Sequence, residues 1–332
     1  MMIVNLSEAD PRWKWLESSF SEQLDWHWAH VSDHASALAP WLPRRRTLAR
    51  AAAGWEAAGH LAGTDSVLVT HGPRPAMYGS ITASLRHRAR RHLAFSFNFT
   101  DLPKGSAHRL MARALRQVDR FVVFSTMERQ LYSEYFDLPP ERFDMLRWGV
   151  QAPAVPVDAV PIEPGDYICA VGSQARDYEM LVDAMRRLPA IKLVLVATPQ
   201  SIAELSTPDN VRVHTNIPIA DAMNILAFSR FMVLPLRHSE VPCGHVTLVS
   251  AMYLGKAILG TDSSGVCDYL KSGFNSRIMP ARDPSAAATM IQMMYESRVS
   301  TESLGAAGRA FALAQCTESK TVDYVRDYLA AG

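Results

Sequence analysis

The chain has 332 residues, of which 48% are hydrophobic and 20% charged, and its formal net charge is +1. This length and composition suit one large or two medium globular domains with sizeable cores. The near-neutral charge, without a recognised binding motif, argues against a nucleic-acid partner.

The sequence shows no pattern typical of a membrane span, a signal peptide or a zinc site. No stretch reaches the roughly 18 to 20 apolar residues of a membrane span, and the start of the chain, MMIVNLSEADPRW, does not follow the pattern of a signal peptide. We therefore expect a cytoplasmic protein. The cysteines lie far apart without the spacing of zinc ligands, and we expect neither a disulfide framework nor a zinc site from Cys169, Cys243, Cys267 and Cys316.

The first half of the chain is the more basic one. Residues 1–150 carry 19 lysines and arginines against 15 acidic residues, a balance of +4, whereas residues 151–332 carry 15 against 18, a balance of −3. Arginines 44–46 follow a group of tryptophans, Trp13, Trp15, Trp26, Trp28 and Trp41. Aromatic rings beside arginines suit peripheral contact with an anionic membrane at the inner face of the cytoplasmic membrane. Alternatively, these tryptophans are ordinary core and surface residues.

Short apolar runs in the first half predict buried strands separated by helices: MIVNL, SVLVTHG, HLAFSFNF and RFVVFS. Polar residues follow two of these runs. Asp101 is a candidate general base for a bound hydroxyl group, because deprotonation needs a carboxylate or histidine within hydrogen-bond reach. Alternatively, Asp101 forms an Asp-Leu-Pro turn. His71, which ends another strand at the same edge, is a competing base.

A proline-rich stretch, VQAPAVPVDAVPIEPGD, divides the chain and predicts an extended linker. Behind it, apolar runs again alternate with helical segments: DYICAVGS, KLVLVAT, NVRVHT, FMVLPL and KAILGT. Alternating strands and helices on both sides of a linker predict two doubly wound parallel-sheet domains.

The segment from Phe231 to Leu270 carries the most specific signal. FMVLPL predicts a strand, and the helix that follows begins at the sequence Cys243-Gly244-His245. The first turn of such a helix presents unpaired N–H groups and the positive end of its dipole, while glycine lets a phosphate approach the backbone. Thr247 adds a hydroxyl donor. After KAILGT, a second turn at 262–266 leads into a predicted helix at 267–270, so two helix N-termini are expected to converge on one anion.

This order of elements resembles the donor-nucleotide half of the GT-B glycosyltransferases, in particular the family-four-like enzymes known as glycosyl transferases group 1. The resemblance covers roughly residues 90–290. It implies an α/β fold of two Rossmann-like doubly wound domains facing a cleft. The domains implied are an acceptor-side domain at 1–150, a linker at 151–164, a nucleotide-sugar donor domain at 165–317, and a C-terminal helix at 318–332 that crosses back to the first domain.

The sequence departs from the family pattern in its two-glutamate motif, which is degenerate here. Retaining members carry two glutamates eight positions apart. Glu240 lies near the first place, where it would assist the reaction or bind donor hydroxyls, but Ser250 occupies the second. Ser250 either hydrogen-bonds the donor or is a small residue that lets its helix pack.

The resemblance also assigns binding roles. Arg176 falls where the family has a lysine that clamps the donor diphosphate; alternatively, it forms an ion pair with Asp177 that caps the next helix. The donor-binding residues implied are Gly172, Arg176, Asp177, Asn216, Ile217, Arg237, Gly244, His245, Val246, Thr247 and Ser250. Asn98 and Arg74 are implied on the acceptor side, and the catalytic candidates are Asp101, His71 and Glu240. His245 contacts phosphate or sugar, or else lies in solvent.

The implied function is transfer of a sugar from a nucleotide-diphosphate sugar, with UDP carried over from the resemblance, to a saccharide or lipid-linked saccharide acceptor in glycan synthesis. Two alternatives stay open: an inactive GT-B-like nucleotide-sugar-binding or scaffolding subunit, and an epimerase or hydrolase of nucleotide sugars. We expect no metal or other cofactor, because cations and helix dipoles neutralise the leaving diphosphate in this fold. No GxGxxG follows a strand, which argues against a nicotinamide dehydrogenase.

Overall fold

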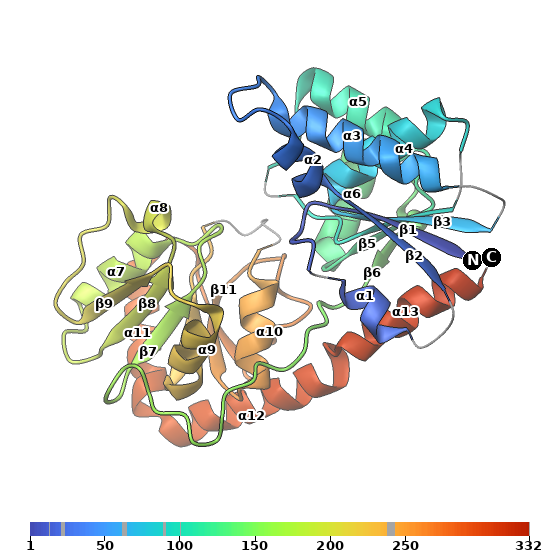
Figure 1. Cartoon of the computed structure of the whole chain (residues 1–332). Helices are drawn as coiled ribbons and strands as arrows, with labels where there is room; N and C mark the ends of the chain where they lie inside the picture. The colour runs from blue at the N-terminus through green and yellow to red at the C-terminus, as the bar shows by residue number, and fades with distance from the viewer. Residues whose placement is uncertain are drawn as a thin grey trace. The chain divides into compact units, whose positions relative to one another are not determined.

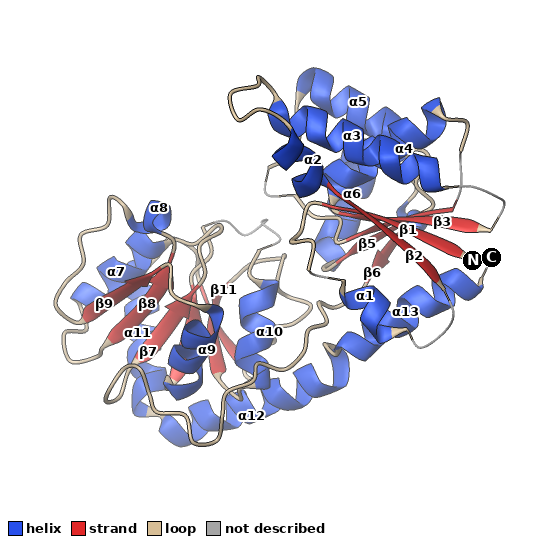
Figure 2. Ribbon diagram, in the orientation of Figure 1, coloured by secondary structure: helices blue, strands red, loops and turns tan. Residues whose placement is uncertain are grey.

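The structure is a computed structural model that describes residues 1–12, 14–20, 24–61, 65–88, 91–99, 101–237 and 243–331, without the side chain of Trp15. The chain divides into two compact units: unit 1 comprises Met1–Leu146 with Val322–Gly332, and unit 2 comprises Arg147–Thr321. Among the described residues, each unit holds a six-stranded parallel sheet with helices packed on it (Figures 1 and 2). The predicted α/β fold class is thereby confirmed.

Unit 1 has the strand order β2-β1-β3-β4-β5-β6. The strands are β1 (Met2–Ser7), β2 (Asp25–His30), β3 (Ser66–His71), β4 (Arg91–Phe95), β5 (Arg120–Val123) and β6 (Phe143–Met145). The helices are α1 (Trp15–Ser19), α2 (Val31–Ala37), α3 (Arg45–His60), α4 (Pro73–Leu85), α5 (Gly105–Leu115) and α6 (Thr126–Phe136), with a 3₁₀ turn at Pro140–Arg142; most of α13 (Glu318–Ala330) also belongs to this unit.

Small residues bring α3 close to the sheet of unit 1. Ala49, Ala53 and Ala57 recur every four residues and form one buried face of the helix, which packs on Val4 and Leu6 of β1. Because alanine adds little volume, these positions let the helix pack closely on the strands. The remaining helices on this face close the core over the aromatic side chains of β5 and β6.

Unit 2 has the strand order β12-β11-β10-β7-β8-β9. Its strands are β7 (Ile168–Val171), β8 (Leu193–Ala197), β9 (Val211–Thr215), β10 (Phe231–Leu234), β11 (Ala257–Thr261) and β12 (Ser276–Met279). Its helices are α7 (Tyr178–Arg186), α8 (Pro199–Ile202), α9 (Ile219–Phe228), α10 (His245–Tyr253), α11 (Pro284–Glu296) and α12 (Arg298–Gln315).

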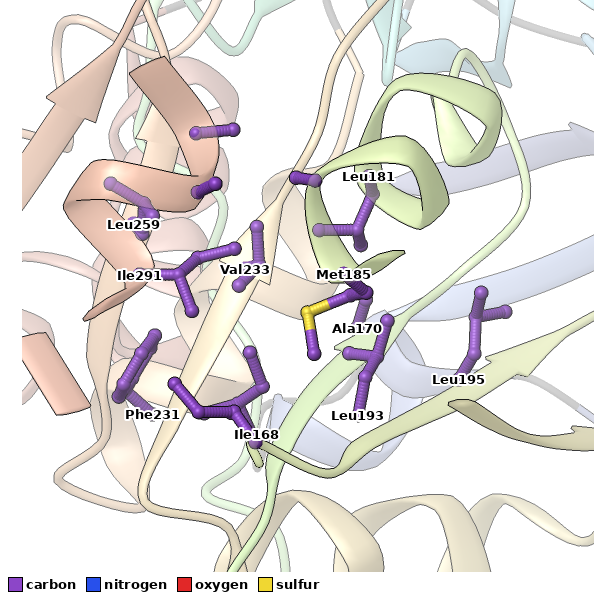
Figure 3. Packing of buried hydrophobic residues seen from close by; sticks show 14 of the residues in the cluster. Ile168, Ala170, Leu181, Met185, Leu193, Leu195, Phe231, Val233, Leu259 and Ile291 are labelled. Carbon is purple, nitrogen blue, oxygen red and sulfur yellow. The ribbon is translucent and has the colours of Figure 1, made fainter. Parts of the chain in front are cut away.

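The inner strands of unit 2, β7, β8, β10 and β11, are apolar on both faces because helices cover both faces. Ile168 of β7 points into a core shared with Met185 of α7 and Ile291 of α11, as Figure 3 shows. The next residue, Cys169, points the other way, into a second core with Leu248 of α10. This two-residue alternation explains why the strand sequences read as continuous apolar runs.

Each sheet has a point where the strand order changes direction, the switch point, at which ligands bind beside the carboxyl ends of the strands in such folds. In unit 2 the first strand, β7, lies between β8 and β10, so the switch point lies between β7 and β10. In unit 1 it lies between β1 and β3. The loops that leave these four strands are therefore the places to look for function.

One predicted element is absent. Residues 267–270 form turns and not the expected helix. The Val266 N–H bonds to Ser263 C=O at 3.2 Å and the Tyr269 N–H to Val266 C=O at 3.0 Å, as in turns, and one longer-range bond joins the Leu270 N–H to Val266 C=O at 2.9 Å. Tyr269 packs in the core beside α10. The prediction that a second helix N-terminus converges on the anion is therefore wrong.

Within the described part of the chain, no helix combines the length and apolar character needed to cross a membrane.

Candidate functional site

The loop after β7 places an arginine under the switch point of unit 2. The chain turns at Gly172, where φ is +111°, a conformation that favours glycine. The Arg176 side chain then folds back beneath this turn and is only 4% exposed. One guanidinium nitrogen, Nη1, donates to the Gln174 carbonyl at 2.9 Å, and Nη2 lies 3.5 Å from the Val171 carbonyl.

The loop after β10 fastens this arginine in place. Arg176 and Leu236 form an antiparallel backbone bridge between the two loops. On either side of it, the Asp177 N–H bonds to Pro235 C=O and the Arg237 N–H bonds to Ala175 C=O, both at 2.9 Å. The Arg237 Nε also donates to the Arg176 carbonyl at 2.7 Å. The predicted residues Arg176 and Arg237 thus come together, with Arg237 supporting the loop that carries Arg176.

Helix α10 completes the arrangement, because Gly244, with φ of +99°, forms its N-cap. A Cβ added at Gly172 would lie 2.8 Å from Arg176 Nη2 and 3.4 Å from Thr247 Oγ1, and one added at Gly244 would lie 3.4 Å from Arg176 Nη1. The guanidinium therefore lies close to both glycines, and the Thr247 hydroxyl in the first turn of α10 lies near Gly172. We call Gly172, Arg176, Gly244 and Thr247 the switch-point cluster.

The charge of this cluster is not balanced within the described residues. Arg176 forms no ion pair with any of them, and its buried Nε has no hydrogen-bond partner there. Burial lowers the pKa of Arg176, because the charged form has lost its hydration. Asp177 does not pair with it as the alternative interpretation required: its carboxylate accepts the Met180 N–H at 3.1 Å and caps α7. A bound anion would compensate the buried positive charge.

Three predicted residues of α10 differ in their surroundings. His245 is buried and its Nε2 donates to the Gly265 carbonyl at 2.8 Å, so the alternative of a histidine in solvent is wrong. Burial lowers the pKa of His245 to about 4, which leaves the ring neutral at pH 7. Val246 is exposed. Ser250 is buried and donates to the Val246 carbonyl at 2.8 Å, as a small packing residue would.

The other donor residues lie farther along the sheet edge or outside the described chain. Asn216, with φ of +53°, and Ile217 follow β9, two strands from β7. The side chain of Asn216 is exposed, and Ile217 packs partly into the core beside α9. Glu240 lies outside the described residues.

The predicted residues of unit 1 follow β3 and β4. His71 is buried at the end of β3, where its Nε2 lies 3.0 Å from Asn5 Oδ1 and its ring stacks on Trp28. Burial lowers the pKa of His71 to about 3, so it is neutral but a weak base. Arg74, in the first turn of α4, and Asn98 and Asp101, in the loop after β4, are exposed.

Two features of unit 1 were missed by the sequence analysis. At its switch point, Glu8 forms a bidentate ion pair with the buried Arg50 of α3, with Nε–Oε1 at 2.7 Å and Nη2–Oε2 at 3.0 Å. After β5, Glu128 is buried and accepts the Phe124 N–H at 2.9 Å and the Ser125 hydroxyl at 3.0 Å. The Ser-x-x-Glu capping pattern at 125–128 was the available signal for Glu128.

The fold of the whole chain is that of the GT-B glycosyltransferases, and the sequence match lies in its second unit. Residues 165–297 match the profile of glycosyl transferases group 1, which confirms the predicted resemblance for that part of the chain. No curated protein sequence matches the chain.

The similar solved structures share the fold at low identity. HepE from Anabaena, in complex with UDP, is 13% identical with a TM-score of 0.74 and is covered over 100% of both chains. A sucrose-phosphate synthase from Thermosynechococcus elongatus is 16% identical with a TM-score of 0.74 over 100% of both chains. A glycosyltransferase from Rickettsia africae is 12% identical with a TM-score of 0.70, covering 99% of this chain and 97% of that one.

Proposed function

We propose that this protein is a glycosyltransferase that moves a sugar from a nucleotide-diphosphate sugar to a saccharide or lipid-linked saccharide acceptor. The observation that carries the proposal is the switch-point cluster, in which a buried guanidinium lies beside two glycines and a helix start. Such an arrangement suits a diphosphate, because guanidinium groups bind phosphate oxygens in pairs and helix N-termini favour negative charge. The profile match over residues 165–297 supports it.

In this proposal the cluster acts on the leaving group. As the bond between the sugar and the diphosphate breaks, negative charge grows on the phosphate oxygens. Arg176, the Thr247 hydroxyl and the first turn of α10 lie around Gly172 and Gly244, and in this proposal they stabilise the growing charge. Gly172 and Gly244 leave the backbone open to the diphosphate.

We further propose UDP as the nucleotide. HepE, a similar structure, has been solved with UDP and with UDP-glucose. In this chain the roles of Asn216 and Ile217 toward the base, and of Asp177, Arg237, His245, Val246 and Ser250 toward the donor, stay predictions.

Of the two candidate bases for the acceptor hydroxyl in unit 1, the Asp101 carboxylate is better placed than His71. Asp101 is exposed after β4, whereas His71 is buried and its pKa of about 3 makes it a weak base. We therefore favour Asp101 if a base is required, with Asn98 and Arg74 contacting acceptor hydroxyls, and keep Glu240 as a prediction.

We also propose that unit 1 contacts an anionic membrane when the acceptor is lipid-linked. Trp41 is 81% exposed and precedes Arg44–Arg46, a pair of features that suits a headgroup surface. Trp26 and Trp28 do not join this surface, because they contact Phe20 and His71. Trp13 and the Trp15 side chain lie outside the described residues. Replacing Trp41 by serine should weaken binding to vesicles containing an anionic lipid while leaving nucleotide binding unchanged.

The proposal is tested by nucleotide binding and by turnover. Calorimetric titration with UDP, GDP and ADP should show selective binding of one nucleotide, and the sugar conjugates of that nucleotide should then be screened with saccharide acceptors for a new glycosidic product. Binding without any turnover would favour the inactive scaffolding subunit. Product formation without an acceptor would favour an epimerase or hydrolase, and absence of binding to every nucleotide would overturn the proposal.

A further inference from the structure

A cluster of imidazole and carboxylate groups lies in unit 1, in a part of the fold that the proposed reaction does not use. One ligand atom each from His27, Glu56 and His60 lies within 4.8 Å of the other two. His27 Nε2 and Glu56 Oε1 are 3.0 Å apart, and the rings of His27 and His60 stack with centroids 3.6 Å apart. His34 Nε2 lies 2.6 Å from the other carboxylate oxygen of Glu56.

Three elements bring these side chains together. His27 lies in the edge strand β2 and faces the same side of the sheet as Ala29, which packs in the core against α3. Glu56 and His60 are four residues apart on α3, so they project from one face of that helix. His34 comes from α2, which lies beside α3 (Figure 1). The ligands are thus held by a strand and two helices of the same unit.

The composition and spacing of the group suit a transition-metal cation. Imidazole nitrogen and carboxylate oxygen are both zinc ligands at bond lengths of about 2.0–2.2 Å, which in a tetrahedral site sets neighbouring ligand atoms about 3.3 Å apart. The distance of 3.0 Å between His27 Nε2 and Glu56 Oε1 is already close to this value. His60, the last residue of α3, is exposed and can adjust its side chain to complete the set.

We propose that His27, Glu56 and His60 form a binding site for a divalent transition-metal cation such as Zn²⁺, with His34 either a fourth ligand or the hydrogen-bond partner that orients Glu56. The ion would tie the edge strand β2 to α3 and stabilise unit 1. This role is structural and independent of the proposed sugar transfer, for which no metal is expected.

The electrostatics of the free cluster agree with this proposal. Neutral imidazole is the form that binds a metal ion. The half-buried carboxylate of Glu56 supplies a negative charge to offset the cation.

The test uses the full-length protein after treatment with a chelator. Titration with Zn²⁺ should show one equivalent bound, and the melting temperature should rise by about 5 °C at a hundredfold excess over the dissociation constant. Co²⁺ in place of Zn²⁺ should give the visible absorption of a four-coordinate nitrogen and oxygen site. Failure of the wild-type protein to bind Zn²⁺ or Co²⁺ overturns the proposal.

Variants locate the ion. His60→Ala changes an exposed side chain at a helix end, so the fold should persist while the Zn²⁺-dependent rise disappears. Glu56→Gln keeps the shape of the side chain but removes its charge, and should weaken Zn²⁺ binding at least tenfold. His87→Asn is the matched control: His87 is an exposed histidine of the same unit with φ of +54°, a conformation that asparagine tolerates. If His60→Ala and Glu56→Gln both bind Zn²⁺ as the wild type does, the ion lies elsewhere and the proposal fails.

Discussion

A buried arginine lies near the switch point of each unit, and the two differ in whether a carboxylate pairs with them. In unit 2, Arg176 is buried without a carboxylate partner among the described residues. In unit 1, the arginine near the switch point, Arg50, is satisfied by both oxygens of Glu8. Unit 1 also buries an acid, Glu128, and burial raises the pKa of this group to about 7, so that it holds its proton below neutral pH.

This difference predicts which substitutions change ligand binding and which change the stability of the fold. An unpaired buried cation costs folding free energy and is offset only when an anion binds. A paired arginine or a protonated carboxyl group is already neutralised within its own unit. Substitutions in unit 2 should therefore change ligand binding, and comparable substitutions in unit 1 should change stability.

The largest expected effect is that of Arg176→Met. Loss of a group that stabilises charge on the leaving diphosphate should lower kcat/KM about 100- to 1000-fold, comparable to loss of one oxyanion-hole donor. The melting temperature should change by less than about 2 °C, because an apolar side chain replaces a costly buried charge. Arg187→Met is the control, since it removes the same charge from an exposed position in unit 2. Near-normal turnover in Arg176→Met would exclude Arg176 from the site.

The next largest effect expected is a pH dependence of the unfolding free energy that arises from Glu128. Its pKa is 4.5 in the unfolded chain and about 7 when folded, so the folded protein binds the extra proton between these values. The stabilisation is complete below pH 4.5, and the free energy of unfolding should fall by about 2–3 kcal/mol as pH rises to 7.

The variant Glu128→Gln removes this titration, so the difference in unfolding free energy between wild type and variant should change by about 2–3 kcal/mol over the same interval. Because the pKa values of His71 and His92 are lowered to about 3, these residues act in the opposite direction as pH falls below 6.5, and only the difference between variant and wild type isolates Glu128. Glu134→Gln, an exposed change on the same helix, should leave the curve unaltered. An equal slope in the Glu128 variant would show that this carboxyl group titrates normally.

The sequence predicted unit 2 better than unit 1, for a physical reason. Gly172, Arg176 and Gly244 belong to loops that follow strands, where the glycine pattern and the resemblance to the family loop locate them without knowledge of packing. Arg50 and Glu8 are 42 residues apart, and their pairing depends on how α3 lies on the sheet. His27 and Glu56 are likewise joined only by tertiary packing, across 29 residues. The helix expected at 267–270 failed because turn bonds and burial of Tyr269 outweighed its local pattern.

A third substitution, Arg50→Met, tests the unit 1 side of the comparison directly. It leaves the Glu8 carboxylate without its cation, and because Glu8 is 34% exposed and partly hydrated, we expect a loss of about 2 kcal/mol in unfolding free energy. Urea unfolding measures this loss. Arg46→Met, one turn earlier and exposed, should cost less than about 0.5 kcal/mol. An Arg50 variant as stable as the control would remove the contrast between the two units.

The smallest effect expected tests whether the space around Arg176 is needed for the ligand. In Gly172→Ala, a methyl group would lie 2.8 Å from Arg176 Nη2 at a φ of +111°, so the guanidinium must move and UDP affinity should fall about tenfold. Gly273→Ala separates crowding from backbone strain, because Gly273 also has positive φ, +81°, but a methyl group there meets nothing within 4 Å. Calorimetric titration of both variants with UDP decides the matter. If the two lose affinity equally, backbone strain alone explains the loss, and the position of the guanidinium beneath Gly172 does not control binding.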